Sequence, residues 1–156
     1  MKILYICTHN RCRSILSEAI TNHLSAGRII AKSAGSQPAG AVHPLSLKYL
    51  SEAGIPVDEL RSQSWDEFED FHADVVITVC DSAAGESCPV WFGNSVKVHW
   101  GLSDPSKLQG SDAELAAAFK ASISEISDRV QQLLSIDVDL SDKTALKQAL
   151  AQIGAQ

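Results

Sequence analysis

The stretch that decides the fold is Lys2-Ile3-Leu4-Tyr5-Ile6-Cys7-Thr8-His9-Asn10-Arg11-Cys12-Arg13-Ser14. Its apolar run, residues 3–6, predicts a short strand, and the pattern that begins at Arg13 predicts a helix directly after it. In a tight turn between a strand and a helix, successive backbone N–H groups can point inward and hold an anion. The positive end of the helix dipole strengthens that site.

The residue types in this turn suit chemistry on a tetrahedral oxyanion. Arg13 offers a planar fork for two oxygens, and the positive environment should lower the pKa of Cys7 below its ordinary value of about 8.5. A thiolate beneath a bound oxyanion is a nucleophile for phosphorus or a chemical relative. The predicted oxyanion-binding residues are Thr8, His9, Asn10, Arg11, Cys12, Arg13 and Ser14. The alternative is that there is no such site: Cys7 is a buried cysteine at the end of a strand, and Arg13 lies on the surface of a helix.

Side chains within the turn have their own expected roles. Asn10 can hold the turn in a left-handed conformation by bonding to neighbouring backbone, and Ser14 can donate a hydrogen bond to Cys7. The role of Cys12 stays open between packing and redox chemistry.

Length and charge narrow the class of protein. A chain of 156 residues with 45% apolar content predicts one domain, residues 1–156, of ordinary globular type. No apolar run approaches the roughly 20 residues of a membrane span, and the N-terminus is too short for a signal peptide, so we expect a cytoplasmic protein. The net charge of -6 argues against nucleic acid or an anionic membrane as partner. We expect a monomer.

The four cysteines, at positions 7, 12, 80 and 88, leave three uses open. A permanent disulfide framework is not expected in a reducing cytosol, which leaves redox catalysis, metal binding or packing. The gaps between neighbouring cysteines do not match the usual spacing of structural zinc ligands, so no metal ligands are assigned.

Strand and helix patterns alternate along the chain. Such alternation predicts a parallel sheet with helices on its faces and right-handed crossovers. Pro44 suits a first helical turn, and Ser64 and Ser111 each open a capping-box pattern. The predicted strands are residues 2–6, 29–33, 74–79 and 96–100, and the predicted helices are residues 13–26, 44–54, a short one after Ser64, 111–134 and 143–153.

Three reactive residues follow predicted strands. Cys7 follows the first strand, Cys80 the third, and Asp104 comes shortly after the fourth. Ligands of parallel sheets bind outside the carboxyl ends of the strands, so these side chains should converge at one edge. A carboxylate there can act as the general acid that protonates a departing oxygen. The alternative for Asp104 is a turn-forming Asp-Pro pair.

The segments Cys7 to Ser14, Ser33-Ala34-Gly35 and Asp104-Pro105 together resemble the low-molecular-weight protein tyrosine phosphatase family, and within it most closely the arsenate reductases. The resemblance runs from Lys2 to about Leu134. It implies a three-layer α/β sandwich around a four-stranded parallel sheet of flavodoxin-like order 2-1-3-4. It also implies Cys7 as nucleophile, Arg13 with the loop amides as oxyanion binders, and Asp104 as acid.

Three features favour reductase over phosphatase within that family. The run Val98-His99-Trp100-Gly101-Leu102 with Asp104-Pro105 resembles the reductase version of the segment that carries the acid. Ser106-Lys107 follow Asp104-Pro105, where tyrosine phosphatases carry aromatic residues that grip the phosphotyrosine ring. The segment from Val79-Cys80 to Cys88-Pro89 resembles the redox segment of arsenate reductases. The resemblance then implies arsenic detoxification by a relay in which Cys7, Cys80 and Cys88 exchange disulfides.

Several points stay open on this evidence. The relay is regenerated by thioredoxin or by glutathione and glutaredoxin, with phosphate or sulfate as competing oxyanions. No tightly bound cofactor is expected, although a potassium ion near Asn10, Glu18 and Ser33 would match thioredoxin-linked relatives. The alternative activities are a tyrosine or small-phosphoester phosphatase with the same nucleophile, and a redox sensor that binds phosphate without turnover.

Overall fold

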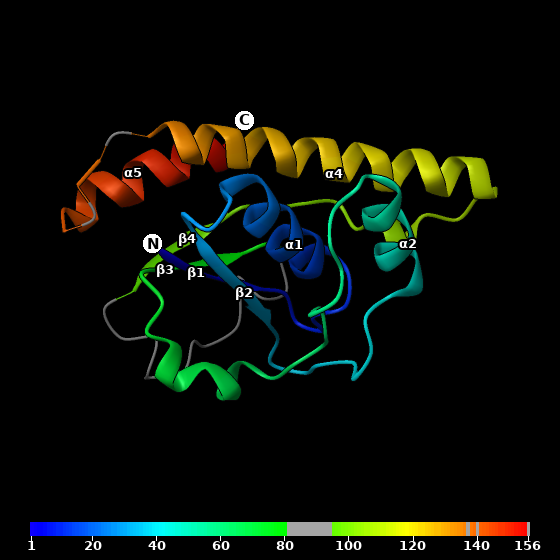
Figure 1. The fold of residues 1–156 in the computed structure, drawn as a ribbon, viewed down its shortest axis with the longest axis horizontal. Helices are drawn as coiled ribbons and strands as arrows, with labels where there is room; N and C mark the ends of the chain where they lie inside the picture. The colour runs from blue at the N-terminus through cyan, green and yellow to red at the C-terminus, as the bar shows by residue number, and fades with distance from the viewer. Residues whose placement is uncertain (81–94, 137, 140, 156) are drawn as a thin grey trace.

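The computed structural model describes residues 1–80, 95–136, 138–139 and 141–155 of the chain. Four parallel strands form one sheet in the order β2-β1-β3-β4, as Figure 1 shows. The predicted order 2-1-3-4 is therefore confirmed. The strands are β1 (Lys2–Ile6), β2 (Ile30–Ala34), β3 (Val75–Thr78) and β4 (Val96–His99).

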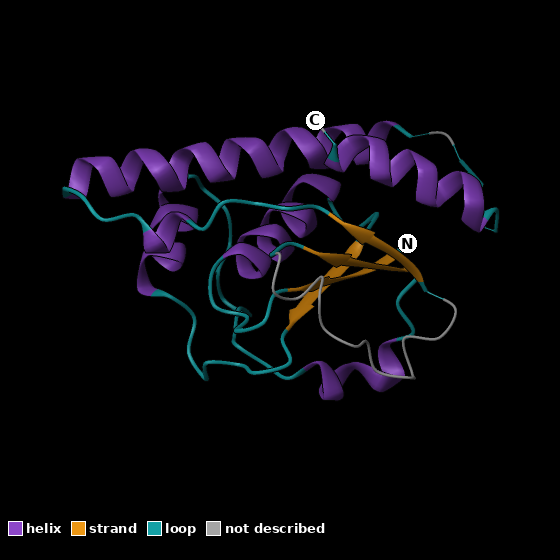
Figure 2. Ribbon diagram, turned by 180° about the vertical axis from the view of Figure 1, so that it is seen from behind, coloured by secondary structure: helices purple, strands orange, loops and turns teal. Residues whose placement is uncertain are grey.

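The helices cover the sheet unequally. Figures 1 and 2 show α1, α4 and α5 on one side of the sheet and the 3-10 helix η1 on the other. The long helix α4 packs against α1, and α5 packs against β4. No described helix is long and apolar enough to cross a membrane. The helices are α1 (Arg13–Ser25), α2 (Pro44–Glu52), η1 (Trp65–Phe71), η3 (Pro105–Lys107), α4 (Asp112–Ser135) and α5 (Lys143–Gly154).

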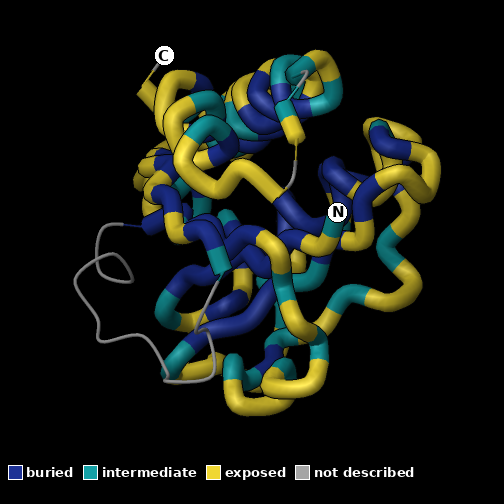
Figure 3. Tube along the Cα trace, turned by 90° about the vertical axis from the view of Figure 1, so that its left-hand side faces the viewer, coloured by how far each residue is buried: buried dark blue, intermediate teal, exposed yellow. Residues whose placement is uncertain are grey.

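The core lies between the sheet and its helices, where the buried tube in Figure 3 is concentrated. Residues 3–6 of β1 are all buried, as expected for the second strand of a four-stranded parallel sheet. Helix α4 buries Phe119, Ile123 and Val130 against the core, while Leu115 is half-buried. Each fully buried large apolar side chain contributes roughly 1.5–3 kcal/mol to folding.

Several predicted element boundaries were wrong by one or two residues, and two of them have a clear physical reason. β2 begins at Ile30 instead of Ile29, because its register is set by pairing with β1, where Lys2 lies opposite Ile30. α2 ends at Glu52 and does not reach Gly54. Gly54 adopts the left-handed φ of 78°, and this lets the Ile55 amide donate to the Leu50 carbonyl and close the helix.

The register of the sheet determines where the site forms. Ile6 of β1 lies opposite Ala34 of β2 and Thr78 of β3, and Thr78 lies opposite His99 of β4. All four strands therefore end at one level. The segments that follow them start from a common edge.

Candidate active site

The structure brings Cys7, Cys80, Arg13 and Asp104 together at this edge of the sheet. The backbone N–H of Thr8 donates to Cys80 Sγ at 3.4 Å, and a hydrogen bond joins the thiols of Cys7 and Cys80. Both thiols are buried and free of disulfides. The fold thus brings together the sulfur atoms of two residues that lie 73 positions apart in sequence. Cys88 lies outside the described residues.

The turn of residues 7–14, which we call the oxyanion loop, is shaped by bonds on its outer side. The carbonyls of Thr8, His9 and Arg11 each accept a hydrogen bond at 2.9 Å. The donors are backbone amides from residues 37–43, namely those of Gln37, Ala39 and His43. In a trans peptide the N–H points opposite to the carbonyl, so the amides of His9 and Cys12 face the inside of the loop. This is the arrangement that an anion site needs.

Helix α1 adds its own positive end to the oxyanion loop. Its N-cap residue, Cys12, makes no side-chain capping bond, and no acidic residue lies in the first turn. The first amides of a helix have no partner within the helix itself. A bound oxyanion would satisfy those donors and the helix dipole together.

Asn10 gives the oxyanion loop its sharp bend. Its φ is +46°, in the left-handed region, and its side chain donates to Ser14 Oγ and accepts from the Gln63 amide, both at 2.8 Å. The predicted left-handed conformation is confirmed. Its own backbone N–H donates to the Cys7 carbonyl at 3.1 Å. Asn10 therefore shapes the loop with its backbone N–H as well as its side chain, and its role in oxyanion binding stays a prediction.

The remaining loop side chains divide between surface and interior. His9 and Arg11 are exposed, and His9 Nδ1 lies 3.1 Å from the Gln37 carbonyl oxygen. Ser14 is fully buried, and its hydroxyl accepts a hydrogen bond from the side-chain amide of Asn10. Burial is the main reason that the pKa of Cys12 is raised to about 11, so this thiol is protonated at neutral pH.

Arg13 and Asp104 form an ion pair across the site. Arg13 Nη2 lies 3.5 Å from Asp104 Oδ2, and Arg13 Nη1 donates to the Leu102 carbonyl at 3.1 Å. The Nε atom of Arg13 is buried with no hydrogen-bond partner among the described residues. An unpaired guanidinium donor at the mouth of an amide-lined loop is suited to an incoming oxyanion.

Asp104 combines the two roles that the sequence left open. Its Oδ1 accepts from the Ser106 amide at 2.9 Å and from the Ser106 hydroxyl at 2.6 Å, and so caps η3 as a turn-forming residue. Its Oδ2 faces Arg13. One oxygen fixes the carboxylate, and the other remains directed into the site.

Cys7 is not activated in this arrangement. Its pKa is raised above the ordinary value, first by the hydrogen bond with Cys80, then by burial, and Arg13 opposes this shift. The predicted lowering of the pKa was wrong for the ligand-free protein. The sequence predicted that Cys80 would lie near Cys7, but it did not show that a hydrogen bond between the two thiols would outweigh the effect of Arg13 on the pKa.

Removing the second thiol should therefore activate the first. We expect Cys80→Ala to lower the pKa of Cys7, because the largest cause of its rise is lost. The rate at which iodoacetamide alkylates the Cys7-containing peptide at pH 7, read by mass spectrometry, should rise by about tenfold or more. The same pH profile in the wild type and in Cys80→Ala would contradict this explanation.

A buried polar network lies behind the oxyanion loop. Ser33 Oγ donates to Glu18 Oε1 at 2.6 Å, and the Gln63 side chain donates to the Ser33 carbonyl at 3.2 Å. The Gln63 backbone continues the network to Asn10. Gln63 was missed by the sequence analysis, since an isolated polar residue between elements carries no recognisable signal. It links β2 to the loop and is buried.

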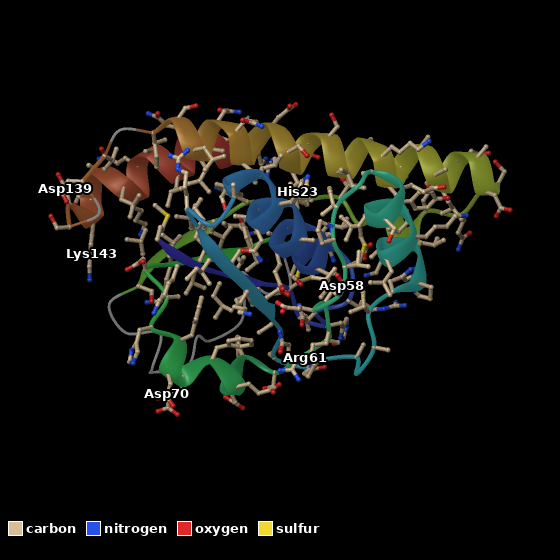
Figure 4. All side chains as sticks on the ribbon, viewed as in Figure 1. His23, Asp58, Arg61, Asp70, Asp139 and Lys143 are labelled. Carbon is tan, nitrogen blue, oxygen red and sulfur yellow. The ribbon has the colours of Figure 1, made fainter. Side chains whose placement is uncertain are left out.

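The predicted potassium ligands Asn10, Glu18 and Ser33 all belong to this network. Their Oδ1, Oε1 and carbonyl oxygens each accept a hydrogen bond from a protein donor. Glu18 also lines a cavity of about 500 Å³ beside α1, together with His23 and Asp58, which Figure 4 labels. The oxygen-rich network suits a hard cation, and its hydrogen bonds already account for these groups, so potassium stays a prediction.

Glu18 should make folding stability depend on pH. Burial raises its pKa to about 7 from an ordinary 4.5, so between these values the folded protein binds more protons than the unfolded chain. Stability should thus fall by roughly 3 kcal/mol as the pH rises from about 4.5 to above 7. Glu18→Gln keeps the acceptor for Ser33 and should remove this dependence. Urea denaturation at pH 5 and pH 8 measures it, and an equal pH response in both proteins would contradict it.

A buried thiol beside a loop of inward amides, faced by an arginine at the edge of a parallel sheet, is an arrangement suited to a tetrahedral oxyanion. Residues 2–150 match the low molecular weight phosphotyrosine protein phosphatase family. The chain belongs to that family.

Individual relatives carry more specific names. An arsenate reductase of Halalkalibacterium halodurans is 36% identical over 129 residues, which cover 83% of this chain and 91% of that protein. A glutaredoxin arsenate reductase of Synechocystis is 29% identical, with 86% and 96% covered. Among solved structures, an arsenate reductase in the phosphate binding state is 26% identical with a TM-score of 0.67, over 86% of this chain and 96% of the other. The thioredoxin-dependent arsenate reductase of Corynebacterium glutamicum is 28% identical with a TM-score of 0.65, over 85% and 59%.

Proposed function

We propose that this chain is an enzyme that reduces arsenate to arsenite. The observation that carries the proposal is the pair of buried thiols, Cys7 and Cys80, which form no disulfide and are in contact at the oxyanion loop. Hydrolysis of a phosphoester needs one thiol, whereas reduction of As(V) to As(III) needs two electrons. Two thiols supply these electrons when they become a disulfide. The relatives named arsenate reductase support the same substrate.

In the first step Cys7, as thiolate, attacks the arsenic of bound arsenate. A sulfur–arsenic bond forms and an arsenic–oxygen bond breaks, and the oxygen leaves as water when Asp104 supplies a proton. Arg13 and the inward amides hold the remaining oxygens. The geometry that supports these roles is the Asp104 oxygen directed at Arg13 at the mouth of the loop.

In the second step Cys80 attacks the sulfur of Cys7. A sulfur–sulfur bond forms, the sulfur–arsenic bond breaks, and its electron pair stays on arsenic, which leaves as arsenite. The N–H of Thr8 lies 3.4 Å from Cys80 Sγ and the Thr8 hydroxyl lies 3.9 Å from it. Donors at this position stabilise a thiolate at Cys80 and so favour the attack.

Regeneration requires an outside reductant. We propose an internal relay in which Cys88 attacks Cys80 and the resulting disulfide is reduced by thioredoxin. The alternative is glutathione attack on the Cys7 adduct, with glutaredoxin resolving the mixed disulfide. Names among the relatives include both a thioredoxin-dependent and a glutaredoxin arsenate reductase, so each reductant is an arm of the test. We propose a cytoplasmic monomer; the reduced state of Cys7, Cys12 and Cys80, none of which is in a disulfide, supports a reducing location.

The test is arsenate-dependent oxidation of NADPH by the pure protein. One mixture contains thioredoxin and its reductase, and the other contains glutathione, glutaredoxin and glutathione reductase. Turnover in either mixture supports the reductase and identifies its donor, and Cys7→Ser controls for background. If neither mixture shows arsenate-dependent oxidation of NADPH and the protein hydrolyses an aryl phosphate, the proposal is overturned in favour of a phosphatase. If the protein turns over neither arsenate nor the aryl phosphate but its thiols oxidise reversibly, the result indicates a redox sensor.

A further inference from the structure

The segment that carries Asp104 is held from behind by a buried arginine of α4. We call residues 101–104 the acid loop. Arg129 Nη1 donates to the Gly101 carbonyl at 3.4 Å, and its Nη2 pairs with Glu125 at 3.1 Å. Arg129 is 5% exposed. We propose that Arg129 is a positioning residue that fixes the acid loop and thereby places the carboxyl group of Asp104 for proton transfer.

The ion pair with Glu125 does not by itself explain a buried guanidinium. The Glu125 side chain is 48% exposed, and a pair with one partner in solvent contributes little to stability. Taking the charge of Arg129 out of water is costly unless its donors find further acceptors. Among the described residues, the Gly101 carbonyl provides such an acceptor. The buried guanidinium of Arg129 is therefore hydrogen-bonded to the acid loop.

The contact lies close to the reacting groups along the chain. The residue after Gly101 is Leu102, whose amide donates to the Val79 carbonyl and whose carbonyl receives Arg13. Asp104 follows two residues later. The start of the acid loop is thus hydrogen-bonded to α4, to the residue after β3 and to the oxyanion loop. Removal of Arg129 breaks the bond to α4.

The expected consequence falls on proton transfer more than on oxyanion binding. Asp104 moves with the acid loop, whereas the amides that bind the oxyanion belong to residues 7–14 and are held by residues 37–43. A general acid contributes about 10²–10⁴-fold to rate, and a small displacement forfeits part of that. We expect Arg129→Met to lower kcat about tenfold, while the Kd for inorganic phosphate changes less than about twofold.

The experiment compares Arg129→Met, Arg129→Lys and the control Glu125→Gln, each in wild-type and Asp104→Asn backgrounds. Phosphate Kd comes from calorimetry and kcat from the arsenate assay. Arg129→Met should add less than about twofold to the loss caused by Asp104→Asn, because both act through one carboxyl group. Arg129→Lys keeps the charge and one donor direction, and should recover part of kcat. Glu125→Gln should keep kcat, since the donor to Gly101 remains.

Three results would overturn the inference: an unchanged kcat in Arg129→Met, a loss that multiplies with that of Asp104→Asn, or a rise in phosphate Kd that matches the fall in kcat. Should Arg129→Met fail to fold, Arg129→Lys is judged by the same criteria. The inference rests on the proposed function only through Asp104 as acid. If the wild type hydrolyses an aryl phosphate and does not reduce arsenate, the coupling is measured on that hydrolysis, and the proposed function fails separately.

Discussion

A Cys80→Ala variant is expected to lose steady-state arsenate reduction with thioredoxin by roughly a thousandfold or more. The Cys80 sulfur contacts Cys7 and receives the Thr8 amide, so it is the thiol placed to attack the Cys7 adduct. Without it the adduct has no internal partner for disulfide formation. The coupled NADPH assay measures the loss.

The same variant should keep the parts of the reaction that need one thiol. Cys7, Arg13 and Asp104 are unchanged, so phosphate binding and any hydrolysis of an aryl phosphate should remain, whereas Cys7→Ser should abolish that hydrolysis. This contrast separates a missing relay from a damaged loop. Full arsenate turnover by Cys80→Ala with glutathione and glutaredoxin would show that the internal relay is wrong and that the reductase uses an external thiol.

Gly35→Ala is expected to disrupt the oxyanion loop although Gly35 lies outside residues 7–14. A Cβ at this position would lie 2.4 Å from the Thr8 carbonyl oxygen and 2.5 Å from that of Cys7. Both are backbone atoms, and both accept hydrogen bonds that shape the loop. Relief of the clash must displace the loop, which should cost about 1–3 kcal/mol of stability and lower kcat/KM about a hundredfold.

Gly27→Ala is the matched control for this substitution. Gly27 has a φ of +91° with no atom within 4 Å of the added Cβ, so it tests backbone strain without contact to the loop. We expect it to lower the urea midpoint modestly and to leave arsenate kinetics unchanged. Equal kinetic losses in both variants would contradict the argument from close approach, as would wild-type activity in Gly35→Ala.

How much of this site could be predicted follows from which interactions are local. The alternation of strands and helices, the left-handed Asn10 and the turn at Asp104-Pro105, given as the alternative role of Asp104, depend on neighbours a few residues away, and they agree with the structure. The convergence of Cys7, Cys80 and Asp104 could also be predicted, because parallel strands end at a common edge. The contacts of Gln63 with Asn10 and of Arg129 with Gly101 could not, since each joins residues that lie far apart along the chain.

The sequence by itself determined the parallel sheet and the turn of residues 7–14 between its first strand and helix, because periodicity and motif are properties of consecutive positions. The tertiary structure alone decided the protonation of Cys7 and the surroundings of Asp104. A pKa depends on distances to other charges and thiols and on the loss of water, and none of these is written in local sequence. Cys80 raises the pKa of Cys7 because the fold places the two sulfur atoms together. This effect outweighs the opposite effect of Arg13, which could be predicted from the sequence.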